Sequence, residues 1–76
     1  MLEKLINDAR LYIKNAVKAE SAINAAFWYG QFIATTEAIE LIDIDTSREL
    51  HTMYSDDKRR CYDKIHKGIF ETILGG

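Results

Sequence analysis

Apolar residues in the first part of the chain recur at helical spacing. Between Leu2 and about Lys18 they stand three and four positions apart, with charged residues such as Glu3 and Lys14 on the positions between. This pattern predicts an amphipathic surface helix with one buried stripe.

The segment from Ser21 to Ile42 has a different pattern, because it is apolar on nearly all sides. Ser21 is a suitable N-cap, although the segment could also continue from the first helix. Small residues recur every four positions along one face, and a glycine among them costs roughly 1 kcal/mol relative to alanine. We therefore expect this row to pack closely against another helix of the same chain: Ala22, Ala26, Gly30, Ala34 and Ala38.

The same segment carries two groups of large apolar residues. Ile23, Phe27 and Leu41 lie beside the row of small residues, and a second group lies on roughly the opposite side of the helix. Either the third helix covers that opposite side, or it stays open as a surface for a second copy or another protein. The predicted apolar anchors of the partner surface belong to this group: Trp28, Tyr29, Phe32 and Ile39.

The last part of the chain begins with a helix-start signal and contains one interruption. Thr46 and Glu49 fit a capping box, and apolar residues then continue to Ile73. Polar residues fill core positions at 55–58, so the helix either kinks there or starts again with Ser55 as N-cap. Gly75 and Gly76 are expected to end it.

These elements predict an all-α fold for residues 1–76, a single small antiparallel three-helix bundle whose third helix is kinked or split near Ser55. Apolar residues make up 47% of the 76 residues and charged residues 29%, which is a globular balance. A core of this size is marginal, and the single cysteine cannot form an internal disulfide, so association with a partner is a means of stabilisation that stays open.

Charge is distributed unevenly. Between Lys18 and Arg48 the sequence has no basic residue, and several acids lie near the C-terminal end of the second helix, where the helix dipole disfavours them. These acids either pair with bases of the same domain or form an acidic rim for a basic partner: Glu37, Glu40 and Asp43.

A basic cluster near the end of the chain offers the alternative function, nucleic-acid binding. It consists of Lys58, Arg59, Arg60, Lys64 and Lys67. Because Asp56, Asp57 and Asp63 are interleaved with it and the net charge is −2, we consider nucleic acid an unlikely partner and expect a salt-bridged, solvated surface.

No enzyme signature survives inspection. The acidic motif 43–46 lacks the preceding strand of a phosphatase loop, and Glu37-x-x-Glu40 lacks the second acidic pair of a metal-dependent hydrolase. Cys61 falls on an apolar stripe, which favours a buried structural thiol. We expect no catalytic residue, no metal site and no cofactor.

The sequence is therefore interpreted as a non-enzymatic protein-binding module, such as a small inhibitor or adaptor of the kind encoded by phages and mobile elements. Its partner would be another protein, a second copy in a homodimer, or both. The chain has neither a leader pattern nor an apolar run long enough to cross a membrane, which predicts a cytoplasmic protein without membrane contact.

Overall fold

The computed structural model describes residues 1–74, apart from the side chains at positions 72 and 74. The predicted helix stop at Gly75 and Gly76 lies outside these residues. The described residues form four helices and no strand: α1 (Leu2–Lys18), α2 (Ala22–Ile42), α3 (Ile44–Met53) and α4 (Ser55–Leu74). The all-α prediction is thus confirmed.

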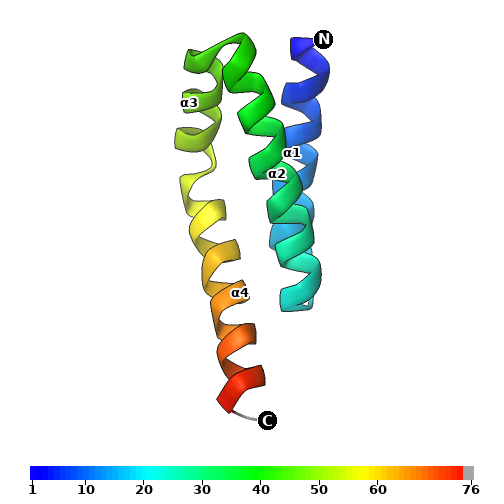
Figure 1. Ribbon diagram of the computed structural model, residues 1–76, viewed down its shortest axis with the longest axis vertical. Helices are drawn as coiled ribbons and strands as arrows, with labels where there is room; N and C mark the ends of the chain where they lie inside the picture. Colours follow the sequence, from blue (N-terminus) through cyan, green and yellow to red (C-terminus); the bar gives the residue numbers. More distant parts are fainter. Residues whose placement is uncertain (75–76) are drawn as a thin grey trace.

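The helices make an antiparallel hairpin of α1 and α2, with α3 and α4 lying end to end along one side of it (Figure 1). The prediction of three helices is wrong in number, because the third helix is divided in two. The break falls at Tyr54, whose backbone leaves helical geometry at φ −104° and ψ 23°. The predicted alternative of a split near this position is confirmed, but Ser55 is the first residue inside α4 and not its N-cap.

Short polar contacts fix the helix starts. Ser21 accepts a hydrogen bond from the Asn24 backbone N–H at 3.1 Å, which confirms its predicted role as the N-cap of a separate second helix. The predicted capping box at Thr46 is wrong, because Asp43 is the N-cap of α3. Its carboxylate accepts from the backbone N–H of Asp45 at 3.1 Å and from the Thr46 hydroxyl at 3.0 Å.

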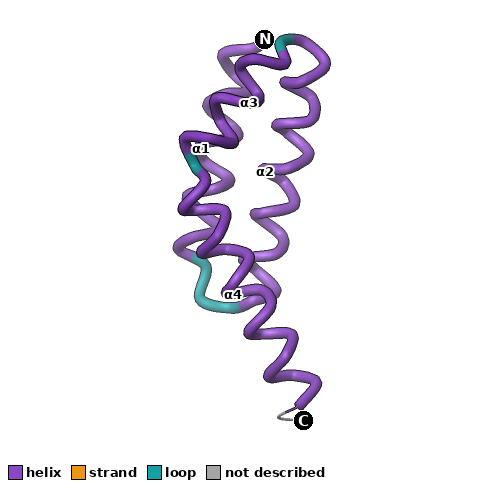
Figure 2. Tube along the Cα trace, turned by 90° about the vertical axis from the view of Figure 1, so that its left-hand side faces the viewer, coloured by secondary structure: helices purple, strands orange, loops and turns teal. Residues whose placement is uncertain are grey.

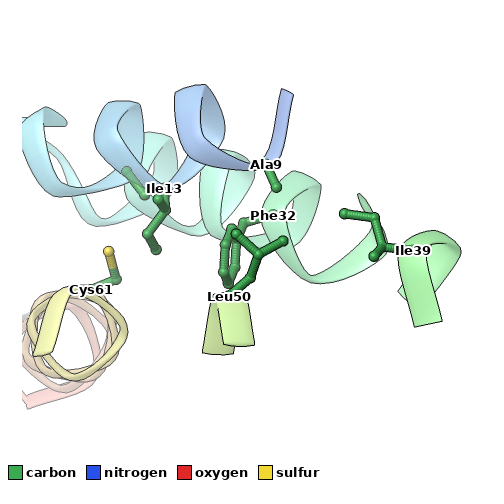
Figure 3. Packing of buried hydrophobic residues seen from close by; sticks show 7 residues of the cluster. Ala9, Ile13, Phe32, Ile39, Leu50 and Cys61 are labelled. Atoms are coloured by element: carbon green, nitrogen blue, oxygen red, sulfur yellow. The ribbon is translucent and has the colours of Figure 1, made fainter. Parts of the chain in front are cut away.

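The core is narrow and receives side chains from all four helices. Ile13 of α1, Phe32 of α2, Leu50 of α3 and Cys61 of α4 are all buried (Figure 3).

The molecule is a rod of 44 × 17 × 17 Å, and α4 extends past the connection between α1 and α2 (Figure 2). A thin rod leaves much apolar surface uncovered, and the candidate site lies on that surface.

Candidate protein-binding surface

The solvent-facing side of α2 carries a mostly apolar stripe, interrupted by Glu37 and bordered by exposed polar residues such as Gln31 and Glu40. The surface comprises residues three or four positions apart, of which Ile23, Phe27 and Leu41 are 82%, 56% and 90% exposed. A helix at the surface of a monomer normally carries polar residues on this side. We call this surface the outer face of α2: Ile23, Ala26, Phe27, Gly30, Ala34, Glu37 and Leu41.

Small residues occupy the centre of the outer face. Ala26, Gly30 and Ala34 are exposed, and a Cβ atom added at Gly30 would have no neighbour within 4 Å. The predicted close contact within the chain along this row is therefore wrong at its centre. Gly30 costs the helix roughly 1 kcal/mol relative to alanine, and no packing within the chain offsets that cost.

The close helix approach occurs instead at the N-terminal end of α2. Gly68 of α4 lies against Ala22, and a methyl group at position 68 would overlap the Ala22 side chain. Beside this contact, an open apolar groove of about 380 Å³ runs between α2 and α4, and Ile23, Ile65 and Ile69 contribute to its walls. The outer face of α2 thus continues into a groove at one end.

Two predicted anchors lie in the core, so their assignment to an exposed surface is corrected. Phe32 and Ile39 have no solvent exposure. Phe32 makes edge-to-face contacts with His51 and Tyr54 at centroid distances of 5.7 and 6.3 Å. Large side chains are needed to fill the space between the α1–α2 hairpin and α3, and alanines on the other side of α2 could not fill it.

The other two predicted anchors are half-buried. Trp28 stacks on Tyr12 of α1 with ring centroids 5.8 Å apart, and Phe27 meets its edge at 5.0 Å. Tyr29 lies parallel to Phe32 at 6.5 Å, and burial raises the pKa of its hydroxyl. The Tyr12–Trp28 stack joins α1 to α2, and both predicted anchors lie beside, rather than on, the outer face.

The predicted acidic rim separates into two parts. Asp43 is occupied as the cap of α3, whereas Glu37 and Glu40 are exposed near the C-terminal end of α2. Among the described residues the only ion pair is Lys4–Asp8, at 3.0 Å. The exposed acids therefore have no internal salt bridge in the part of the chain that the structure describes.

The predicted basic cluster does not form one surface. Lys58 contacts His51 Nδ1 at 2.9 Å, and Lys64 Nζ donates to the carbonyls of Val17 and Ala19, both at 2.7 Å. Lys64 thus caps the C-terminus of α1, where a cation is favoured. Of the five bases, Arg59, Arg60 and Lys67 are exposed.

The titratable groups of α3 and α4 follow their surroundings. Burial lowers the pKa of His51, and the charge of Lys58 lowers it further. Burial raises the pKa of the Cys61 thiol, which has no solvent exposure.

Within residues 1–74, no three His, Cys, Asp or Glu side chains gather as a metal site would require. None of the helices in this range is both long and apolar enough to cross a membrane.

The sequence shows two apolar sides on α2, and the partner surface was predicted on the wrong one. Ile23, Phe27 and Leu41 form one side, but the opposite side is equally apolar. Only the positions of the neighbouring helices decide which side faces inward.

The chain matches no known protein family, no curated protein and no solved structure.

Proposed function

We propose that this chain is a non-enzymatic protein-binding module that acts through the outer face of α2. The observation that carries the proposal is the exposure of Ile23, Phe27 and Leu41 along one side of α2. Exposed apolar patches mark interaction sites in water-soluble proteins. A small inhibitor or adaptor, the class expected from the sequence, would bind its target through such a surface.

The shape of the surface favours a helix as the binding element of the partner. Gly30 and Ala34 at its centre would let the backbone of a second helix come close, while Ile23 and Leu41 would pack against that helix near its two ends. Mixed apolar and acidic character, with Glu37 within the surface, would suit an amphipathic partner helix. Nucleic-acid binding has weaker support, because Lys58 and Lys64 are used inside the bundle.

A pair of leucine variants tests the proposal. Leu41→Glu places a charge on the outer face, and Leu11→Glu places one on α1 at a leucine that is also exposed, by 53%. Both should keep the helical circular dichroism of the wild type, since neither side chain is in the core. Tagged protein is then used to recover partners from extracts of the source organism, with identification by mass spectrometry.

We expect a protein, which can be an untagged copy of the chain, to be recovered with the wild type and with L11E and to be lost with L41E. Recovery of no protein, or equal recovery with both variants, would contradict binding through this face. In either case the circular dichroism shows that the variants are folded, so the result bears on binding alone.

A further inference from the structure

We propose that a second copy of this chain covers the outer face of α2, with the two α2 helices antiparallel about a twofold axis. This inference rests on the proposed function and names its partner. It is carried by the residue spacing and the charges of the exposed face, and it agrees with the large surface area of the whole chain.

The outer face has the spacing of a coiled-coil seam. Successive residues lie four, three, four, three and four positions apart, which is the heptad pattern that keeps one stripe of a helix against a partner helix. The pattern occurs on the exposed side of α2, where no helix of the same chain uses it. The seam residues are Ile23, Phe27, Gly30, Ala34, Glu37 and Leu41.

The seam is self-complementary when two copies run antiparallel. A twofold axis outside the outer face, level with position 32, places Ile23 beside Leu41 of the second copy, Phe27 beside its Glu37 and Gly30 beside its Ala34. Large residues then meet at both ends and the smallest ones meet at the centre, so the two backbones can approach closely. A twofold interface requires this reciprocity, because each contact must occur twice.

The end layers of this arrangement also match the groove. Leu41, the more exposed of the two end residues at 90%, would enter the second copy beside Ile23. Ile23 lines the apolar groove that α2 forms with Ile65 and Ile69 of α4. At each end of the interface, therefore, the protruding Leu41 side chain of one copy meets the apolar groove of the other copy.

Charge selects the antiparallel orientation. Residues 21–36 carry no charge, whereas Glu37 and Glu40 lie toward the C-terminal end of α2, where its own dipole disfavours them. A parallel pair would bring Glu37 against Glu37. The antiparallel pair instead places each acidic end along the uncharged N-terminal half of the other helix, and brings Glu40 near its positive terminus.

The chain exposes more surface than a compact monomer of its mass. The chain exposes 5379 Å², whereas a compact monomer of 8.7 kDa exposes about 4,700 Å². The excess of about 650 Å² belongs to the whole rod, of which the outer face of α2 is one part. The radius of gyration, 13.3 Å against about 11.4 Å for a compact chain of this length, has the same origin in the rod shape.

Light scattering and sedimentation over a concentration series test the dimer. The wild type and the control L11E should have twice the mass of the single chain. L41E and Gly30→Leu, whose added side chain meets nothing within its own chain, should be monomeric with unchanged helicity. We expect at least a tenfold rise in the dimer dissociation constant for each.

Disulfide trapping tests the orientation. Positions 23 and 41 are about 27 Å apart along one helix, so Ile23→Cys combined with Leu41→Cys cannot close within a chain. In the antiparallel pair each new cysteine faces its counterpart, and mild oxidation should give a covalent dimer on a non-reducing gel. Each single variant should stay uncrosslinked, and Cys61 is buried in all of them.

The outcomes separate this inference from the proposed function. A monomeric wild type, crosslinking of the single variants, or a dimer that L41E leaves intact would each overturn the antiparallel α2 pair. If the wild type is monomeric but recovers a different protein that L41E loses, the proposed function stands and the second copy is not the partner. If nothing is recovered either, both fail.

Discussion

Gly68 of α4 packs against Ala22 at the start of α2, and this contact leaves no room for a side chain at position 68. A Cβ atom at position 68 would overlap the Ala22 Cβ atom, which is rigidly attached to its backbone and cannot move aside alone. Gly68→Ala should therefore push α4 away from α2. Helix propensity would favour alanine by about 1 kcal/mol, but overpacking costs about 1 to 3 kcal/mol, so we expect a net loss of stability in urea unfolding.

Gly30→Ala is the matched control for this prediction. Gly30 also lies inside a helix, but a methyl group there has open space. Made in the L41E background, where association cannot contribute, this change should raise the free energy of unfolding by up to about 1 kcal/mol. A stabilising Gly68→Ala would show that α2 and α4 are not in close contact.

Lys64 connects the end of α1 to α4 across 45 positions of sequence. Its ammonium group donates to the Val17 and Ala19 carbonyls, which would otherwise lack a helical partner. Lys64→Met keeps the aliphatic stem and removes these charged hydrogen bonds. We expect a loss of about 1.5 to 3 kcal/mol in the free energy of unfolding, measured by urea titration.

For this second prediction the control is Lys67→Met, because Lys67 is exposed on the same helix. An exposed substitution of this kind should change stability by no more than about 0.5 kcal/mol. Equal effects of the two variants would mean that Lys64 does not cap α1.

His51 makes the stability depend on pH. Burial, followed by the charge of Lys58, lowers the pKa of His51 in the folded chain below its ordinary value of 6.5. The unfolded chain therefore binds a proton first as the pH falls through 6.5, and the folded state loses stability from there down to the lowered pKa. Above pH 6.5 both states are neutral at this residue and its contribution is constant.

Thermal unfolding between pH 8 and pH 5 should thus show a falling midpoint in the wild type. His51→Gln should flatten that part of the profile. A profile that His51→Gln does not change would assign the acid sensitivity to another group.

The helices could be predicted from the sequence because their signals are local. The spacing of Leu5, Ile6 and Ile13 predicts α1. The Ser21 hydroxyl caps the start of α2 by accepting a hydrogen bond from the backbone N–H three positions further along the chain. The start of α3 was misplaced because Asp43 and Thr46 are both good N-caps, and the choice depends on where α2 ends. Asp43 closes α2 with its N–H and opens α3 with its carboxylate.

The candidate site could not be placed from the sequence for a physical reason. Both sides of α2 are apolar, so hydrophobicity alone cannot distinguish Phe32 from Phe27. The distinction comes from α3, which covers Phe32 and brings Ser47 close enough to donate to the Thr36 carbonyl at 3.0 Å. The internal use of Lys64 is equally non-local, because it needs α4 to lie against the end of α1.

These two phenylalanines provide the most direct test of which side of α2 is the core. Phe32→Ala removes a side chain with no exposure and should cost about 3 to 5 kcal/mol. A chain of 76 residues has a total stability of roughly 4 to 11 kcal/mol, so this variant should lose a large part of its stability and unfold at a much lower urea concentration than the wild type, as followed by circular dichroism. Phe27→Ala, at a residue that is 56% exposed on the same helix, should remain folded and weaken association instead. The reverse result, a folded Phe32→Ala variant and an unfolded Phe27→Ala variant, would mean that α2 is turned the other way and that its outer face is the side bearing Trp28.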